Sequence, residues 1–590
     1  MKKTVTRFIA VLLAVVMVFT FSGCRKDEGG NKTPTAAVTK EPLNEKPSEA
    51  PVETPTQTPA ATSEPTPEAT PEVTPEVTPE ATPEPTPEVT PEVTPVVQID
   101  DVPGVIPINT GIYYDSYWDE DKNERNGWYS CDYPKLATGY DLIYPELADM
   151  FDAFYLNRVE TAEEWMQRII EATGDDWDQE CYRNENLTVT RSDTELICLS
   201  YYTDYYMGGA HGTCYSSSIC IDPVTLEDVT LNDIIKDRDV FIDYVYDHVT
   251  LDADPSDFSD FDNIRKYIEE SFDLGFLNFE VGYNYLAVIF NPYELKNLAY
   301  DQIFVDIPFK GNENLINDRY LRHPENYMVR MDKTRSVTTD LGDDGVINSV
   351  RIYGDIVNEY EDIGALVFYL NEQPVPKNFE LEFDAYDLDC AYIHCDDRDY
   401  IYVTYWHDSD DDLTYIYRID VPENGFDEEA FDNPYGDIIQ VSDSGMEFDQ
   451  KATYDPKYMT MSLRTDVMGT DFCTMHYAMG EDGDIHEVDD YYLFYGYFSE
   501  GGEITLKDDL TFVKLDAEGN PGEETVLPGG SKLKRFRTDL ETYVDFIMGE
   551  ETVRLPMMRK SDDDDENFWM YVTLDGEYLF RLFDGLSFAD

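Results

Sequence analysis

A proline-rich tract near the N-terminus sets the strongest limit on what this sequence can fold into. From Thr66 onward the chain repeats Thr-Pro-Glu-x with a mostly four-residue period. Segments of this composition populate extended polyproline II and cannot bury a core. At ~3.1 Å per residue, about seventy residues reach on the order of 200 Å. Residues 24–97 are therefore predicted to be a tether, and folded domains are expected only after it.

The first 23 residues have the pattern of a bacterial export signal. An uncharged run at residues 8–21 follows three basic residues, and this run is shorter than a typical membrane span. It leads into Phe-Ser-Gly-Cys, ending at Cys24, which resembles a bacterial lipobox with Phe21 where leucine is usual. The resemblance implies that Cys24 is lipidated and holds the protein on the extracytoplasmic face of the cell membrane. An ordinary signal peptide and an uncleaved anchor are the alternatives.

The chain is strongly acidic, with 43 Lys and Arg against 123 Asp and Glu and a formal net charge of −80. Its 590 residues exceed what one core usually holds, so we expect two or three domains. The negative charge repels phosphate backbones, which argues against nucleic acid as a partner. Basic proteins and divalent cations are better candidates. Solvation is the alternative explanation for the acidity.

Residues 98–322 are predicted to form an α+β domain with a mixed or antiparallel sheet. Helices are expected at Glu160–Ala172, Val240–Val249 and Phe261–Phe272, and strands at 187–190, 195–202, 214–221, 283–290 and 303–308. The first of these helices is the most amphipathic, because apolar residues recur there at helical spacing. Its apolar residues are Ala162, Trp165, Met166, Ile169 and Ile170. Helices and strands in separate blocks favour α+β over regular βαβ alternation.

Two short motifs stand out in this domain. Tyr205–Thr213 reads Tyr-Tyr-Met-Gly-Gly-Ala-His-Gly-Thr, and Phe290–Glu294 reads Phe-Asn-Pro-Tyr-Glu. Three glycines within five residues predict a tight turn with positive φ, which aims His211 in a particular direction. Pro292 forbids continuation of the strand that precedes it.

Together these motifs resemble the extracytoplasmic domain shared by RsiV-type anti-sigma factors and PdaC-type peptidoglycan deacetylases, over roughly residues 106–317. The resemblance implies recognition of lysozyme or action at peptidoglycan. No nucleophile or metal motif accompanies His211 in the sequence, so we interpret this residue as structural, with ligand binding and catalysis as alternatives. The candidate ligand-binding residues are Tyr205, Gly208, Gly209, His211 and Tyr293.

Eight cysteines follow Cys24, at positions 131, 181, 198, 214, 220, 390, 395 and 473. In an exported protein an even number permits four disulfides, but the sequence does not choose among the pairings. Cys214 and Cys220 cannot pair if they share one strand, because six residues of strand span roughly 20 Å. Free buried thiols are the alternative.

A second, β-rich region begins after His323-Pro324. Residues 325–500 contain short β-like runs such as Tyr400–Tyr405, separated by turns rich in Asp, Gly and Asn. They predict an all-β region, sandwich or propeller-like. Residues 501–590 are similar to a small five-stranded barrel of the Src-homology-3 kind and form the last predicted unit.

An acidic loop in the β-rich region is a candidate cation site. Residues 340–345 read Asp-Leu-Gly-Asp-Asp-Gly and resemble the calcium loops of repeat-type extracellular β proteins, except that Gly342 stands where Asp is usual. Asp340, Asp343 and Asp344 are therefore candidate calcium ligands, although calcium needs six to eight oxygens. An Asp-Gly turn without metal is the alternative interpretation.

These features predict a lipid-anchored surface protein with a non-catalytic binding or sensing domain. Its expected ligand is peptidoglycan or a basic protein such as lysozyme, and charge complementarity suits the basic protein. An enzyme that acts on cell-wall glycan through Asp/Glu pairs is one alternative, although no motif marks such a pair. A calcium-stabilised adhesin is the other. No cofactor besides calcium is expected.

Replacing Cys24 with Ala tests the anchor. The acyl chains supply the membrane affinity, so Cys24→Ala should release the protein from membranes or leave its precursor uncleaved. Membrane fractionation and the intact mass of the protein measure these two effects. Unchanged fractionation together with an unchanged mass would contradict the lipoprotein assignment.

Overall fold

In the computed structural model, the described part of the chain lies within residues 104–586. The gaps within this range are 120–123, 173–179, 210, 252–253, 297–301, 332–335, 357–361, 372, 407–412, 421–436, 445–446, 449–451, 495–502, 517–518, 550 and 560–570. The predicted signal peptide, Cys24 and the tether lie outside the described residues. Among the helices that are described, none is long and apolar enough to cross a membrane.

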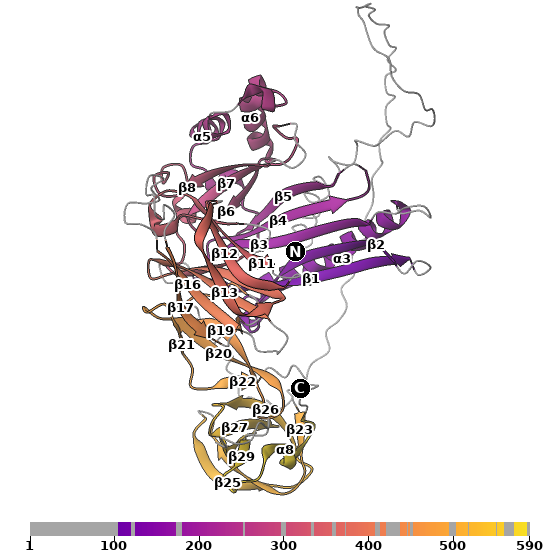
Figure 1. The fold of residues 1–590 in the computed structure, drawn as a ribbon, viewed down its shortest axis with the longest axis vertical. Coiled ribbons are helices and arrows are strands. Elements are labelled where there is room, and N and C mark those ends of the chain that lie inside the picture. The colour runs from indigo at the N-terminus through magenta and orange to yellow at the C-terminus, as the bar shows by residue number, and fades with distance from the viewer. Residues whose placement is uncertain are drawn as a thin grey trace, which may run out of the picture. The chain divides into compact units, whose positions relative to one another are not determined.

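The first sheet has five strands in chain order (Figure 1). They are β1 (Ile108–Asp119), β2 (Glu124–Leu136), β3 (Cys181–Ser192), β4 (Ile197–Tyr206) and β5 (Thr213–Ile221). Neighbours are antiparallel except β2 and β3, which run parallel. Parallel neighbours need a crossover connection, and α2 (Tyr140–Ile143) and the long helix α3 (Pro145–Ala172) lie in that connection.

Helix α3 packs on one face of this sheet. It begins at Pro145, which suits a first helical turn because no amide donor is needed there. The predicted helix at Glu160–Ala172 is the C-terminal part of α3. Its apolar stripe shares a buried cluster with Tyr129, Cys131 and Cys181, and the buried members are Ala162, Trp165, Met166 and Ile169. Ile170 is 42% exposed, so its predicted place in the stripe was wrong. One residue turns a helix by about 100°, and Ile169 takes the position that faces the sheet.

The rest of the α+β part combines short helices with a three-stranded antiparallel sheet. This sheet has the order β6 (Asn278–Val281), β7 (Tyr285–Phe290) and β8 (Ile303–Pro308). The helices are α4 (Leu231–Ile234), α5 (Arg238–Thr250), η1 (Pro255–Asp257), η2 (Phe261–Asn263), α6 (Ile264–Leu274) and α7 (Asp318–Leu321). Side chains from β4, β5, α5, α6, β7 and β8 share one buried cluster. The predicted α+β class is confirmed for this part.

In the β-rich part, a central sheet is buried on both faces. Its order is β17 (Asp437–Ser444), β16 (Leu413–Asp420), β15 (Arg398–Trp406), β14 (Asp387–Cys395) and β9 (Tyr327–Met331). Ile401 and Val403 lie in a buried cluster with side chains of β11 (Asn348–Ile356) and β12 (Ile363–Leu370). Tyr400 and Tyr402 lie in another, with side chains of β19 (Met459–Thr465) and β20 (Asp471–Met479). Burial of both faces explains why Tyr400–Tyr405 lacks a polar alternation.

The sheet on one side of the central sheet is four-stranded, with the order β10 (Val337–Thr339), β11, β12 and β13 (Gln373–Ala385). The short helix η3 (Leu341–Asp343) connects β10 to β11. The β-rich class predicted for residues 325–500 is therefore confirmed, and its sheets pack face to face through the clusters just described.

The last sheet has thirteen strands and stays open over the residues that are described. Besides β19 and β20 it contains β18 (Glu447–Phe448), β21 (Ile485–Glu487), β22 (Tyr492–Phe494), β23 (Glu503–Leu506), β24 (Leu510–Leu515), β25 (Pro521–Leu527), β26 (Lys532–Thr538), β27 (Tyr543–Met548), β28 (Glu551–Arg559), β29 (Tyr571–Thr573) and β30 (Phe583–Asp584), the last preceded by helix α8 (Leu579–Leu582). The prediction that residues 501–590 form a small barrel was wrong. Tyr492 of β22 pairs with Thr538 of β26, so the hydrogen bonding of β26 continues into strands that precede residue 501.

A buried ion cluster lies between α3 and the first sheet. Glu185 of β3 accepts hydrogen bonds from Arg158 of α3 and from Arg183, each at 2.5 Å, and from the Tyr129 hydroxyl at 3.2 Å. Both guanidinium groups also lie over aromatic rings, Arg158 over Tyr201 and Arg183 over Trp165. Burial alone would raise the pKa of Glu185, but the two arginines outweigh it and lower that pKa. The cluster therefore holds a charged carboxylate inside the protein.

Glu185→Gln should destabilise the fold strongly, because it leaves two buried arginines without their shared counter-charge. Removing one partner of a buried ion pair costs about 3–5 kcal/mol. Urea unfolding measures the loss. Glu551→Gln is the matched control, since the Glu551 pair with Lys514 is exposed and such pairs contribute under about 1 kcal/mol. Equal losses of unfolding free energy in the two variants would show that the buried cluster stabilises the fold no more than an exposed pair does.

Candidate functional site

The predicted glycine turn forms the connection between β4 and β5. Gly208 and Gly209 have φ of +91° and +113°, which confirms the predicted positive φ at these two positions. Gly212 serves close approach instead, because a Cβ there would lie 3.1 Å from the carbonyl oxygen of Tyr205. The three glycines therefore meet two different steric demands in one turn.

The candidate residues of this turn point to different environments. His211 is exposed, and its Nδ1 lies 2.7 Å from the Gly212 carbonyl oxygen. Tyr205 instead packs toward α3, with its ring centroid 5.6 Å from that of Trp165 and 6.4 Å from that of Tyr215. The turn thus presents His211 and Gly209 at the surface, while Tyr205 supports it from the side of the helix.

The second motif, Phe290–Glu294, forms a corner at the end of β7. The strand ends at Phe290, which confirms the predicted stop before Pro292. The Asn291 side chain reaches β5, where its Oδ1 accepts from the Ser216 amide at 2.7 Å and its Nδ2 donates to the Ser216 carbonyl at 3.0 Å. Gln302 of the segment before β8 donates to the same Oδ1 at 2.9 Å. The corner is therefore fixed on the strand that the glycine turn introduces.

Tyr293 is the exposed residue of this corner. Its φ is +68° and its side chain is 52% exposed. A non-glycine residue at positive φ costs of order 1–3 kcal/mol and persists only where its surroundings impose it. The Asn291 bonds supply that constraint, so the fold holds Tyr293 outward at an energetic cost.

Glu294 closes the corner from inside. Its Oε2 accepts from the Asn291 amide at 2.9 Å. Burial raises the pKa of Glu294 to about 7, against the lowering effect of the Asn291 hydrogen bonds. The side chain therefore changes charge near neutral pH while it holds the backbone of the motif.

An aromatic row lies on the face of the first sheet opposite α3. Its members are Tyr114 of β1, Trp128 of β2 and Tyr182 of β3, which stack with centroid distances of 6.2 and 5.2 Å. Trp118 flanks the row four residues beyond Tyr114 on β1, and its Nε1 donates to the Ser116 hydroxyl at 3.2 Å. Tyr114 and Trp118 are 50% and 52% exposed. The sequence pattern did not reveal this row, because aromatic residues of β1 point to both faces of the sheet. Only the strand register shows which of them stack with Trp128 and Tyr182.

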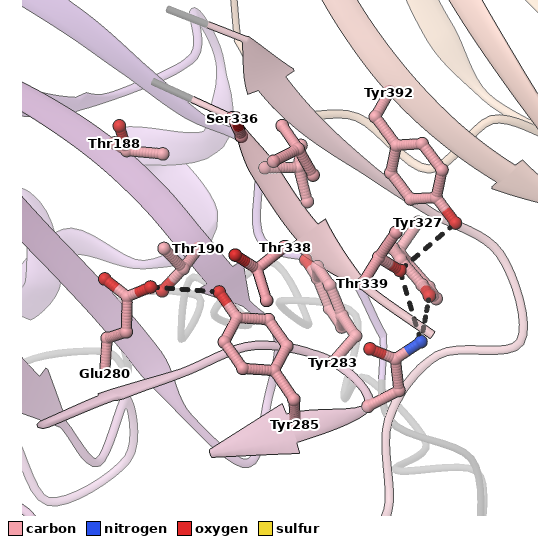
Figure 2. Close-up of a pocket in the computed structure, with 13 residues that line it drawn as sticks. Thr188, Thr190, Glu280, Tyr283, Tyr285, Tyr327, Ser336, Thr338, Thr339 and Tyr392 are labelled. Atoms are coloured by element: carbon pink, nitrogen blue, oxygen red, sulfur yellow. Dashed lines mark hydrogen bonds between the residues drawn. The ribbon is translucent and has the colours of Figure 1, made fainter. Parts of the chain in front are cut away.

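A polar recess lies where the α+β part meets the β-rich part, and its empty volume of about 390 Å³ includes open solvent. Figure 2 shows Glu280 and Tyr285 at one side and Tyr327 with Tyr392 at the other. Glu280 accepts from Ser200 at 2.6 Å and from the Tyr285 hydroxyl at 3.1 Å. The lining also includes Thr188, Thr190, Thr338, Thr339, Tyr283 and Asn284. Within the lining, Asn284 donates to the Tyr327 and Thr339 hydroxyls and Thr339 donates to the Tyr392 hydroxyl. No motif in the sequence marked these residues.

The acidic loop is organised by its own backbone. Asp340 is buried, and its carboxylate accepts the Asp344 and Gly345 amides, each at 2.9 Å. The Gly342 amide donates to buried Asp399 at 3.1 Å, and Asp344 is exposed. Asp343 ends η3, and its side chain lies outside the described residues. Over the residues that are described, no group of three or more His, Cys, Asp or Glu side chains could hold a metal ion. Calcium binding by Asp340, Asp343 and Asp344 stays a prediction.

No protein-family model and no curated protein matches the chain. Solved structures do match, among them the following two. A DUF3298 family member from Bacteroides fragilis NCTC 9343 is 13% identical with a TM-score of 0.24, and the match covers 37% of this chain and 95% of that one. A DUF3298 family protein from Pseudomonas aeruginosa PAO1 is 12% identical with a TM-score of 0.25, covering 37% and 97%. DUF3298 is the domain shared by RsiV-type and PdaC-type proteins, but similarity at these TM-scores does not establish the family.

Glu294→Gln should stabilise the protein at alkaline pH. The unfolded carboxyl titrates near about 4.3, whereas the folded pKa is about 7. Between these values the unfolded state loses a proton that the folded state keeps, so the free energy of unfolding falls as pH rises through this window. Glutamine keeps an acceptor for the Asn291 amide and cannot ionise.

Urea unfolding of both proteins across roughly pH 4.5–8, a range that spans the window between the two pKa values, measures this effect. The variant's advantage should be small at the acidic end and reach on the order of a few kcal/mol at the alkaline end. A difference that does not change with pH would show that Glu294 ionises as readily in the folded protein as in the unfolded chain.

Proposed function

We propose that this chain is a lipid-anchored, extracytoplasmic binding protein, and that its α+β part recognises a basic protein that acts on the cell wall. The observation that carries the proposal is the aromatic row with its exposed flank on the open face of the first sheet. The sequence supports the location through the export signal and Cys24. The resemblance of the two motifs to lysozyme-sensing domains supports the class of ligand.

Aromatic side chains on a partly exposed sheet face suit a protein interface. Tyr and Trp are enriched at the centres of interfaces, because they offer a large contact area with few rotatable bonds. Tyr114 and Trp118 combine about half exposure with fixed positions, since Tyr114 accepts from Arg125 at 2.8 Å and Trp118 donates to Ser116. Little side-chain entropy is therefore lost when a partner covers them.

The charge of the protein favours a basic partner. The formal net charge is −80, so a cationic protein is attracted and an acidic one repelled over about a Debye length. Lys and Arg side chains of such a partner can also lie over the exposed faces of Tyr and Trp rings. Peptidoglycan is the alternative ligand for the same rings. Measuring the binding of both ligands to the same protein distinguishes them.

Trp118→Ala should weaken binding of lysozyme, used as the basic probe, by roughly tenfold or more, as expected for an exposed aromatic residue that a partner covers. Titration calorimetry with the full chain measures the affinity, and added salt should weaken it in the wild type. Phe276→Ala is the matched control, because Phe276 is an exposed aromatic residue that follows α6 and lies outside the first sheet.

Equal losses of lysozyme affinity in Trp118→Ala and Phe276→Ala would show that the aromatic row is not part of the interface. Sedimentation with purified peptidoglycan provides the second measurement. Binding to peptidoglycan without binding to lysozyme would replace the basic protein by glycan as the ligand.

A further inference from the structure

Two cysteines of the first sheet face each other across neighbouring strands. Cys198 of β4 and Cys220 of β5 are register partners in the antiparallel pair. Directly opposite residues of such a pair have Cα atoms roughly 4.5–5.5 Å apart. A disulfide requires roughly 4.4–6.8 Å between the same atoms. The backbone of β4 and β5 therefore meets the distance requirement without movement.

The side chains point toward each other within the core. The two Sγ atoms lie 3.2 Å apart, and both residues belong to the buried cluster that joins the first sheet to β6–β8 and the helices. The amide of Val281 donates to the Cys198 Sγ at 3.3 Å. The pair is thus oriented by its strands and held in place by its neighbours.

The register leaves the other cysteines without an opposing cysteine. Cys214 shares β5 with Cys220, and Cys390 shares β14 with Cys395. The strand partners of the remaining three are other residue types: Cys131 faces Tyr113 and Glu185, Cys181 faces Gly127, and Cys473 faces Leu463 and Phe494. Of the eight cysteines after Cys24, Cys198 and Cys220 are the pair that the register brings together.

We propose that Cys198 and Cys220 form a disulfide that closes the β4–β5 hairpin at its base. The Cys198 and Cys220 thiols lose two protons, a bond forms between their sulfurs, and two electrons pass to a small disulfide oxidant, which becomes two thiols. The link spans 22 residues and encloses the glycine turn with His211. It would hold together the two strands that carry this turn and the Asn291 contact.

The burial of the pair determines when the bond forms. Cys198 is fully buried and Cys220 is only 4% exposed, so a disulfide oxidant in solution cannot reach either sulfur once the protein is folded. Oxidation therefore takes place during folding, before β6–β8 and the helices cover the hairpin. Once folded, the disulfide is shielded from reductants, and thiols left reduced are shielded from oxidants.

The test is oxidative refolding of the full chain. The protein is denatured and reduced, refolded in a mixture of reduced and oxidised glutathione, treated with an alkylating reagent under denaturing conditions, and digested without reductant. Mass spectrometry should find a peptide that links Cys198 to Cys220 and is two hydrogen atoms lighter than the sum of its parts. The other thiols should carry the alkyl group.

Matched variants separate this pair from general thiol oxidation. Cys214→Ala lies on the same strand as Cys220 and should leave the link intact, whereas Cys220→Ala should abolish it. The oxidised wild type should also unfold at a higher urea concentration than the same protein refolded under reductant. Alkylated Cys198 and Cys220 after oxidative refolding, or links scattered over other cysteines, would overturn the proposal. The experiment does not depend on export, so its failure would leave the proposed function standing.

Discussion

The buried pair of Arg191 and Asp193 is the interaction through which the parts of this protein are held together. Both side chains are completely buried and joined at 2.7 Å. Arg191 also donates to the carbonyl oxygens of Tyr320 and Arg322 in the segment that leads into β9. Asp193 accepts the amides of Glu195 and Leu196 and so shapes the turn between β3 and β4. One ion pair thereby fixes both the β3–β4 turn and the segment that leads into the β-rich part.

This arrangement shows how a very acidic chain uses its few cations. Several deeply buried carboxylates are matched by arginine: Glu185 by Arg158 and Arg183, Asp471 by Arg535, and Asp545 by Arg537 and Arg554. A buried carboxylate requires such partners, because its desolvation is otherwise too costly. Arginines used inside the fold do not neutralise acidic groups at the surface. The surface therefore keeps the negative charge that attraction of a basic partner, as proposed, requires.

The two sequence motifs meet on the β4–β5 hairpin, whereas the aromatic row of the proposed interface lies on β1, β2 and β3. The glycine turn begins β5, Asn291 fixes the Phe290–Glu294 corner on Ser216 of β5, and Cys220 near the end of β5 faces Cys198. The corner holds Tyr293 outward at positive φ, while Tyr205 packs inward on Trp165. The hairpin is thus a rigid support whose exposed tip and corner are displayed to solvent.

Local chemistry in the sequence was sufficient to predict the C-terminal part of α3 at Glu160–Ala172, the positive φ of Gly208 and Gly209, and the strand end before Pro292. Each depends on residues that are near one another in the chain, so periodicity or backbone sterics reveals it. The same kind of reasoning excluded a bond between Cys214 and Cys220, which share β5.

Only the tertiary structure decided the contacts between distant segments. The aromatic row requires the register of β1, β2 and β3. The opposition of Cys198 and Cys220 requires the register of β4 and β5, and a shift by one residue would turn the two side chains to opposite faces. The open last sheet, in place of a barrel, follows from one pairing between β22 and β26. These features were invisible in the sequence because strand register and sheet packing are set by the whole core, and no local pattern records them.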